Sequence, residues 1–203
     1  MSKICLFGAS GHGKVVKDLA LSLNTEIKIF VDDNPKRDLL QDIPVIKYQE
    51  IEHYKKYKFI ISIGDNTIRK RISEKLESTF AMLIHKTAII SSSAKILEGT
   101  VVMPGAIINA ETSIGKHVII NTAVIIEHDC IIDDFVHISP NATITGNVSI
   151  GEGSHIGAGA IIIPNISIGK WVTIGAGTVV IENVPDFAIV VGNPGKIKKY
   201  NKY

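Results

Sequence analysis

The chain is poor in cysteine, in excess charge and in long apolar runs, and each shortage excludes a class of protein. Its 203 residues hold two cysteines, Cys5 and Cys130, both within apolar, strand-like stretches. Two such cysteines indicate a reducing compartment rather than a disulfide scaffold. The net charge is only +2, and the Lys and Arg residues are spread along the chain. This pattern predicts neither a nucleic-acid partner nor an anionic membrane surface as a partner.

Membrane insertion and secretion are also not expected. No apolar run approaches the length that spans a bilayer. The run from Lys3 to Phe7 is too short for a signal peptide and leads directly into glycines. The sequence therefore predicts a soluble, cytoplasmic protein whose length suits one large domain or two small ones.

The second half of the chain carries one aliphatic residue at every sixth position. A small or β-branched residue often follows four positions later, and a glycine often follows directly. This period fits neither an α-helix nor an ordinary strand, and it is typical of a parallel β-helix built from hexapeptides. The positions of the repeat are all Ile or Val: Ile90, Ile96, Val102, Ile108, Ile114, Ile120, Ile126, Ile132, Ile138, Ile144, Ile150, Ile156, Ile162, Ile168, Ile174 and Val180.

A triangular prism is the physical consequence of this repeat. Three hexapeptides make one coil of eighteen residues, and residues eighteen apart stack roughly 4.8 Å apart, as neighbouring strands do in any sheet. The repeated aliphatic residues point inward, and each coil buries its apolar side only against its neighbours. We therefore expect an all-β parallel β-helix over residues 85–203, ending in a C-terminal tail.

Residues 1–84 differ from the repeat because strands alternate with helices there. Strands are expected at 4–7, 27–31 and 59–63, and helices at 14–23 and about 67–77. The segment between the second and third strands, which contains Pro35 and Pro44, is expected to be irregular. This alternation predicts a parallel sheet, half of a Rossmann domain, with ligands at the carboxyl ends of the strands.

A glycine-rich turn follows the first expected strand. Glycines between a strand and a helix let backbone N–H groups approach a phosphate, although a plain tight turn has the same composition. The spacing is Gly-x-x-Gly-x-Gly rather than that of dinucleotide domains, and only half of a dinucleotide fold is available. A mononucleotide or a nucleotide sugar therefore fits better than NAD.

Acidic and basic residues near this sheet edge complete the candidate nucleotide site. Asp32 or Asp33 is placed to accept from a ribose hydroxyl or a base N–H. Lys14 and Arg69 are candidates for a pyrophosphate, with a solvated helix face as the alternative. The nucleotide-sugar-binding residues that we predict are Gly8, Ser10, Gly11, His12, Gly13, Asp32, Asp33, Gly64, Asn66 and Arg69.

In the repeat, the stacking of coils brings distant residues together in columns. Gly146 lies eighteen residues after His128, and His155 lies eighteen after His137. Asp129 adjoins His128, and a carboxylate that reaches the ring would make this imidazole a general base near neutral pH. Because adjacent residues on a strand point to opposite faces, the pair requires a turn of the chain. The columns alone leave a structural corner histidine equally open.

Several stretches together resemble the bacterial nucleotide-activated amino-sugar N-acetyltransferases of the bacillosamine-pathway type. These belong to the sialic-acid O-acetyltransferase-like family of hexapeptide acyltransferases. The resemblance covers nearly the whole chain. It rests on these stretches: Gly8-Ala9-Ser10-Gly11-His12-Gly13, Asp32-Asp33, Ile63-Gly64-Asp65-Asn66-Thr67-Ile68-Arg69-Lys70, Leu83-Ile84-His85-Lys86, Ile107-Ile108-Asn109-Ala110, Val124-Ile125-Ile126-Glu127-His128-Asp129-Cys130 and Gly192-Asn193-Pro194.

The resemblance implies a left-handed coil, a homotrimer and acetyl-CoA in the groove between neighbouring prisms. It also implies that a UDP-linked amino sugar, with dTDP or GDP as alternatives, binds the N-terminal domain. His128 would take the proton from the sugar amine, with Asp129 as its partner, and Gly146 would offer its N–H to the thioester oxygen. The acetyl-CoA-binding residues implied are His137, Gly146, Ala158, Ala176 and Lys196.

Other functions and roles remain open at this point. O-acetylation of a sialic acid or another sugar hydroxyl is the main alternative, and a non-catalytic nucleotide-sugar-binding protein is a distant one. A metal enzyme on the same prism would need an H-x₄-H pair, which the spacing of His117, His128 and His137 does not provide, so we expect no metal. Cys130 is expected to pack in the core rather than carry an acyl group.

Overall fold

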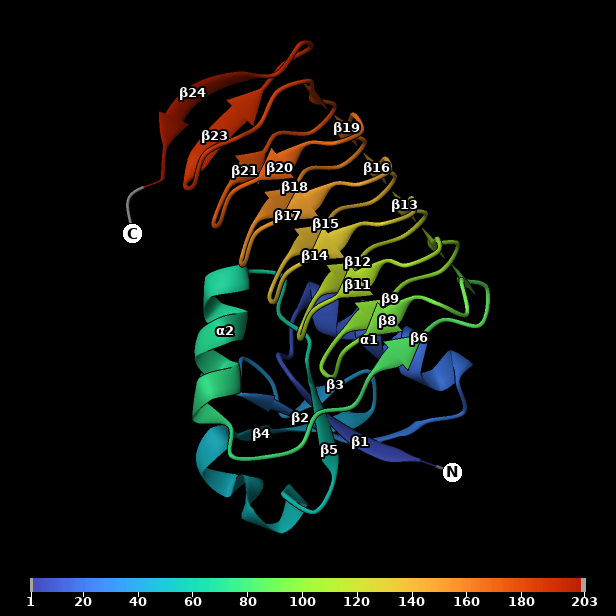
Figure 1. Ribbon diagram of the computed structural model, residues 1–203. Coiled ribbons are helices and arrows are strands. Elements are labelled where there is room, and N and C mark those ends of the chain that lie inside the picture. Colours follow the sequence, from blue (N-terminus) through green and yellow to red (C-terminus); the bar gives the residue numbers. More distant parts are fainter. Residues whose placement is uncertain (1, 202–203) are drawn as a thin grey trace.

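The computed structural model describes residues 2–201 and consists of an N-terminal α/β domain under a tall coil of short strands (Figure 1). The domain contains β1 (Lys3–Phe7), α1 (Gly11–Ser22), β2 (Glu26–Asp32), β3 (Leu39–Leu40), β4 (Ile43–Lys47), the 3₁₀ helix η1 (Tyr48–Tyr54), β5 (Lys58–Ile61) and α2 (Asn66–Lys75). Its sheet has the order β3-β4-β2-β1-β5, and every pair except the β3–β4 hairpin is parallel. This arrangement confirms the predicted half-Rossmann sheet.

The segment between β2 and β5 is more ordered than we expected. Residues 39–54 form β3, β4 and η1 instead of an irregular stretch. Val45 and Ile51 are buried there, so each element is held by contact with the main sheet rather than by a strong local pattern. Pro44 is tolerated because β4 lies near the edge of the sheet, in the hairpin with β3.

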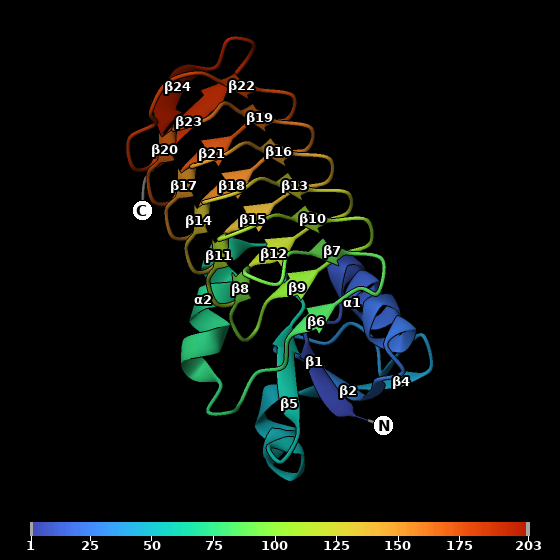
Figure 2. The same cartoon turned by 45° about the vertical axis from the view of Figure 1, so that its right-hand side comes forward.

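The coil has three flat faces, which Figure 2 shows as three columns of strands. The first face contains β6 (Leu83–Ile84), β9 (Val101–Val102), β12 (Ile119–Ile120), β15 (His137–Ile138), β18 (His155–Ile156), β21 (Thr173–Ile174), β23 (Ala188–Val191) and β24 (Lys196–Tyr200). The second contains β7 (Ile89–Ile90), β10 (Ile107–Ile108), β13 (Ile125–Ile126), β16 (Thr143–Ile144), β19 (Ile161–Ile162) and β22 (Val179–Val180). The third contains β8 (Lys95–Ile96), β11 (Ser113–Ile114), β14 (Ile131–Ile132), β17 (Ser149–Ile150) and β20 (Ser167–Ile168).

The register of these strands confirms the eighteen-residue coil. Ile126 pairs with Ile144, and His137 pairs with His155, all in parallel. The repeated Ile and Val residues fill the interior, and Ile108 to Ile162 of this series are almost fully buried. The fold is the left-handed parallel β-helix that the repeat and the resemblance together predicted.

The corners of the coil require backbone that most residues avoid. Between the second and third faces, four stacked residues adopt the left-handed region, with φ from 56° to 63°: Glu111, Asp129, Asn147 and Asn165. Asparagine and aspartate tolerate this conformation better than other side chains do. The amide of Asn147 also donates to Asn165 Oδ1 at 2.8 Å, so these two stacked side chains are hydrogen-bonded along the corner.

The two domains share one buried boundary. β6 pairs with β9, so the coil begins two residues before the expected boundary at His85. Leu6 and Leu19 of the N-terminal domain belong to the same apolar cluster as Met103 and Ile119 of the coil. α1 and α2 lie on opposite sides of this junction in both views (Figures 1 and 2). No helix among residues 2–201 is long and apolar enough to cross a membrane.

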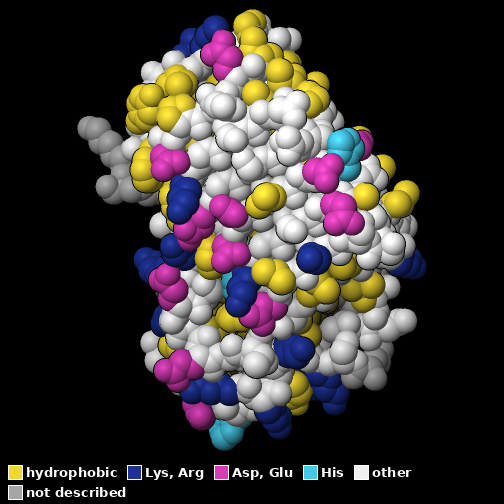
Figure 3. Space-filling model, in the orientation of Figure 1, with side chains coloured by type: hydrophobic (Ala, Val, Ile, Leu, Met, Phe, Trp, Pro, Cys, Tyr) yellow, Lys and Arg dark blue, Asp and Glu magenta, His cyan; other side chains and the backbone are white. Residues whose placement is uncertain are grey.

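In Figure 3, positively and negatively charged side chains are mixed over the lower left part of the surface. No patch of one sign dominates there. Lys70 of α2 and Glu152 of the coil form one such pair across the domain boundary, at 2.5 Å. Both side chains are half-buried and still reached by water, which screens the pair, so its contribution is small and the buried contacts decide how the domains dock.

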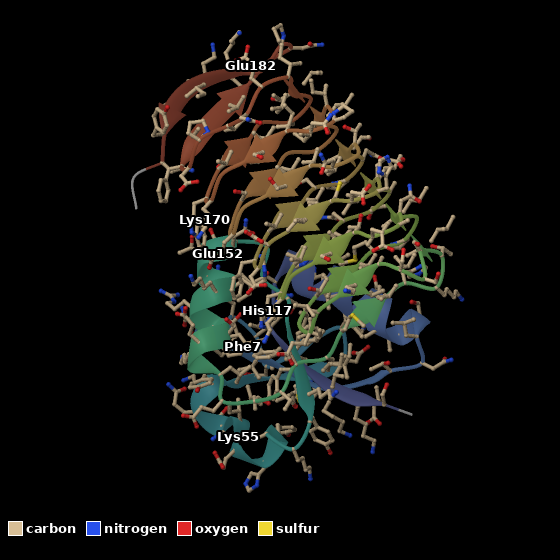
Figure 4. The ribbon with its side chains drawn as sticks, viewed as in Figure 1. Phe7, Lys55, His117, Glu152, Lys170 and Glu182 are labelled. Carbon is tan, nitrogen blue, oxygen red and sulfur yellow. The ribbon has the colours of Figure 1, made fainter. Side chains whose placement is uncertain are left out.

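His117 lies inside the domain junction (Figure 4) and is 4% exposed. Its ring stacks on Phe135 with centroids 5.2 Å apart and meets Phe80 edge-on at 4.4 Å. Among the described residues, nothing hydrogen-bonds to its Nδ1. Burial and the neighbouring Arg69 charge lower the pKa of His117 to about 4, so the folded protein holds this imidazole neutral.

We expect His117 to make folding less stable in mild acid. The unfolded chain gains a proton at the ordinary pKa of 6.5, whereas the folded chain gains it only near 4. The free energy of unfolding should therefore fall between these values by up to about 1.4 kcal/mol per pH unit, and it should be unaffected above 6.5. Thermal unfolding of His117→Phe should show a shallower dependence over this window. The matched variant His53→Phe changes an exposed histidine and should keep the wild-type slope; equal slopes for all three proteins would contradict the assignment.

Candidate functional site

The first candidate site is a cavity of about 310 Å³ at the carboxyl ends of β1 and β2. Gly8 has a φ of 117°, and a Cβ on this residue would collide with the backbone of Ser62, so the turn needs glycine. A side chain at Gly13 would likewise meet the carbonyl oxygen of Gly8. The cavity is lined by Ala9, Ser10, Gly11, Lys14, Asp32, Asn34, Lys36, Arg37 and Leu40.

The chemistry of this cavity suits a phosphorylated nucleoside. The carboxylate of Asp32 is oriented by the N–H groups of Ala9, at 3.2 Å, and Asn34, at 2.9 Å. α1 begins at Gly11, and its N-cap, Ser10, makes no side-chain capping bond, so backbone donors face the cavity. Lys14, Lys36 and Arg37 add positive charge.

Some predicted residues of this site are elsewhere. Asp33 pairs with Lys75 of α2 at 3.0 Å. Arg69 is 1% exposed, and its donors bind carbonyl oxygens, while the amide of Asn66 donates to Gly153 O. The Arg69 side chain is therefore not available to a pyrophosphate, whereas Lys14, the other candidate, lines the cavity. Conversely, Lys36 and Arg37 line the cavity but were not among the predicted residues, although two cations a few positions after an acidic strand end are a usable signal.

Three imidazoles form a row between the glycine turn and the first face of the coil. The rings of His12 and His137 lie 6.4 Å apart, and those of His137 and His155 stack at 4.8 Å. His137 Nδ1 lies 3.3 Å from Gly64 O, and His155 Nε2 lies 2.8 Å from Ser139 Oγ. Burial, together with the Arg69 charge, lowers the pKa of His137 to about 3 and that of His12 to about 4, and it also lowers the pKa of His155. The row is therefore a set of neutral, polar rings.

A small polar cavity of about 150 Å³ lies at the upper end of this row. Its lining joins the start of α2 to the first face of the coil. The residues are Gly64, Asp65, Asn66, Thr67, Gly153, His155, Trp171 and Thr173. Predicted nucleotide-sugar residues Gly64 and Asn66 are thus brought to the imidazole row, whereas Ser10, Gly11 and Asp32 line the larger cavity.

His128 and Asp129 form the second candidate centre, at the corner between the second and third faces. Asp129 has a φ of 61°, and this turn lets two adjacent side chains meet: His128 Nδ1 lies 2.8 Å from Asp129 Oδ2. Both side chains are exposed, His128 by 62%. If the proton of the neutral ring is on Nδ1, it donates to the carboxylate and leaves Nε2 as a base.

The ring of His128 lies against Gly146, as the column arithmetic predicted. A Cβ on Gly146 would come within 2.7 Å of Cε1 and 2.8 Å of Nε2 of the imidazole. Among residues 2–201, no acceptor is bonded to the Gly146 N–H. Cys130, two residues beyond His128, is fully buried in the coil core and donates to Thr145 O. Burial raises the pKa of this thiol, which matches a packing role.

The remaining predicted residues lie on other parts of the coil. Ala158 and Ala176 are exposed at the corner between the first and second faces, where side chains added at Gly159 and Gly177 would meet nothing within 4 Å. Lys196 borders a cleft of about 240 Å³ beside the last coil. An extended chain could therefore run along this bare corner. Among residues 2–201, no group of three or more His, Cys, Asp or Glu side chains could hold a metal ion.

One chain does not bring all these parts together. His137 is on the first face, whereas His128 is at the corner between the second and third faces. The apolar core of the coil lies between these positions. The structure thus joins His128 to Gly146, and His12 to His137, but it does not join the two pairs within one chain.

Comparisons with known proteins agree with both halves of the architecture. Residues 3–76 match the PglD N-terminal domain, and residues 147–182 match the bacterial transferase hexapeptide (six repeats). UDP-N-acetylbacillosamine N-acetyltransferase of Bacillus subtilis is 41% identical over 112 residues, which cover 51% of this chain and 52% of that protein. An uncharacterized mimivirus protein, L142, is 34% identical over 101 residues, 49% of this chain and 21% of that protein. The aligned region thus spans about half of the first relative's length and less of the second's.

Two solved structures match almost end to end. The acetyltransferase domain of PglB from Neisseria gonorrhoeae, in complex with acetyl coenzyme A, is 40% identical, with a TM-score of 0.90 over 96% of this chain and 98% of that one. A mutant of perosamine N-acetyltransferase from Caulobacter crescentus, in complex with CoA and GDP-perosamine, is 32% identical. Its TM-score is 0.93 over 98% of each chain. The chain belongs to the family of sugar N-acetyltransferases that join a PglD N-terminal domain to a hexapeptide-repeat β-helix.

Proposed function

We propose that this protein transfers an acetyl group from acetyl-CoA to the 4-amino group of a nucleotide-linked amino-deoxy sugar. The observation that carries the proposal is the pairing of His128 with Asp129 directly over Gly146, in a chain that also holds a phosphate-suited cavity at its glycine turn. Relatives named for UDP-N-acetylbacillosamine and perosamine support this substrate class. The glycine-turn cavity counts against a free sugar as the acceptor.

The residues at the corner would divide the chemistry between them. His128 Nε2 takes the proton from the attacking amine, while Asp129 orients the ring through Nδ1. A positioned general base of this kind contributes about 10²–10⁴ in rate. The Gly146 N–H stabilises the negative charge that develops on the thioester oxygen, a contribution of about 3 kcal/mol per donor. Direct attack by the amine then needs no acyl group on the enzyme, in agreement with the buried Cys130.

The bare corner of the coil would hold the acetyl donor. Ala158, Ala176 and the glycines beside them let a pantetheine arm approach the backbone, and the cleft at Lys196 suits the phosphates or the adenine. The glycine-turn cavity would hold the nucleotide, with Asp32 accepting from the ribose or the base. The sugar would then extend from Ser10 and Gly11 toward the imidazole row.

The complete site would form between copies of the chain, in a homotrimer. The outward side chains of the second face are almost all apolar, and Ile89 is 65% and Ile161 42% exposed. The corresponding positions of the third face are mostly Ser and Lys. Hydrophobic side chains gather along the upper and right-hand edges of the view in Figure 3. A second copy packed on the second face would cover this apolar surface. The His128 of one copy could then lie at the first face of the other copy.

The proposed function predicts release of free CoA thiol only when both substrates are present. UDP-, dTDP- and GDP-linked 4-amino sugars are each supplied with acetyl-CoA, and thiol release is measured with a thiol reagent. The matched control is a sugar nucleotide with a hydroxyl in place of the 4-amine. Release with one amino sugar and little with its hydroxyl counterpart would support N-acetylation. Equal release with both would favour O-acetylation, and no release with any sugar nucleotide would reject the proposal.

A further inference from the structure

Arg69 is a buried cation, 1% exposed, at the junction of the two domains. Among residues 2–201, its guanidinium hydrogen-bonds to neutral oxygens and to no carboxylate. Nε donates to His117 O at 2.8 Å, Nη2 to Phe135 O at 2.7 Å, and Nη1 to Ile63 O and Gly64 O at 3.0 and 3.2 Å. Such a side chain is costly to bury unless its planar set of donors is needed in that place.

The acceptors of Arg69 tie the N-terminal domain to successive coils. His117 and Phe135 are eighteen residues apart and therefore stack directly above each other. Asn66 extends the series, because its Nδ2 donates to Gly153 O at 2.9 Å, eighteen residues further on, while its Oδ1 accepts from Arg69 Nη2 at 2.8 Å. We call Asn66, Arg69 and the carbonyl oxygens that they bind the interdomain latch.

The interdomain latch reaches the imidazole row through one shared oxygen. Gly64 O accepts from Arg69 Nη1 and also lies 3.3 Å from His137 Nδ1. On the other side of the ring, Asn121 Oδ1 accepts from the Thr122 N–H at 2.9 Å, so the amide nitrogen of Asn121 faces His137 Nε2, at 3.2 Å. An amide nitrogen is a donor, and Nε2 must therefore be the acceptor. Both contacts require the proton of His137 to be on Nδ1.

We infer that Arg69 is a positioning residue: through Gly64 O it holds His137 in one orientation and one tautomer, and it holds the nucleotide-sugar domain against the coil. This inference rests on the proposed function, in which the sugar lies between the glycine turn and the imidazole row. Arg69 itself touches no substrate. Its loss would leave the glycine-turn cavity and the bare corner of the coil intact, but it would misplace the acceptor relative to the acetyl group.

Substitution of Arg69 should therefore separate binding from turnover. Arg69→Met is expected to lower kcat about a hundredfold, the scale of loss that follows a displacement of about 1 Å. The affinities for free UDP and for CoA, measured by calorimetry, should remain close to the wild-type values. Arg69→Lys keeps the charge but not the planar set of donors, and it should lie between Arg69→Met and the wild type. Arg71→Met, an exposed arginine on the same helix, is the matched control and should leave kcat unchanged.

The tautomer of His137 is a second measurement, and it would not change if Arg69 had a purely structural role. In ¹⁵N-labelled wild-type protein, the ring nitrogens of His137 should show a neutral imidazole protonated on Nδ1, and Arg69→Lys or Arg69→Met should alter this pattern. A wild-type ring protonated on Nε2 would overturn the inference, even if neither variant folds. A folded Arg69→Met with full kcat would also overturn it. If the wild-type protein shows no transferase activity, the proposed function is rejected. The tautomer of His137 still tests the role of Arg69 in that case.

Discussion

His128→Ala is expected to lower the turnover of acetyl transfer at least about a hundredfold, the lower end of what a positioned general base contributes. The imidazole is the only base that the structure places over Gly146 among the described residues, and its partner Asp129 fixes which nitrogen faces outward. The side chain is exposed and lies outside the coil core, so the variant should fold normally. Turnover is measured by thiol release at saturating concentrations of both substrates.

Nucleotide-sugar affinity is the control for this variant. It should change little, because the glycine-turn cavity belongs to the other domain. Near-wild-type turnover of His128→Ala would rule out the proposed base. A parallel loss of affinity would instead assign His128 to substrate binding.

Gly146→Ala tests whether close contact between residue 146 and the His128 ring affects turnover. The new Cβ would lie 2.7 Å from Cε1 of His128, so the ring must move, whereas the backbone N–H of residue 146 is retained. Turnover should fall for the single variant. In the His128→Ala background the ring is absent, and the same substitution should have little further effect. Fully additive losses would show that the two residues act independently.

Mixing two inactive variants is expected to restore activity, because the proposed site is shared between copies. His128→Ala and His137→Ala each damage one side of every site in their own homotrimers. In a mixed trimer, a His137→Ala chain can supply His128 to a His128→Ala chain that keeps His137. Random assembly of equal amounts would make about a quarter of all interfaces complete.

The measurement is thiol release after the two variants are unfolded together and refolded, compared with the same proteins refolded separately and then combined. Only the jointly refolded sample should regain activity. A mixture that stays as inactive as its components would place both histidines in one chain's site, or would show that the protein acts as a monomer. The same samples should be sized by light scattering to establish the oligomeric state.

The repeat and its consequences could be read from the sequence because they depend on neighbouring residues alone. An aliphatic residue at every sixth position determines both the inward side chains and the length of the coil. The contact of His128 with Gly146 and the stack of His137 on His155 then follow from the eighteen-residue register. The glycine turn was recognisable for a similar reason, since only Gly at position 8 fits its backbone.

Only the tertiary structure decided how the two domains meet and which side chains the meeting uses. Arg69 and Asn66 look like ligand-binding residues in the sequence, yet they bind carbonyl oxygens of coils that lie far along the chain. Domain docking depends on contacts between the N-terminal domain and the coil, and no repeat relates the two sequences. A pattern in one domain therefore does not show which groups the other domain places against it.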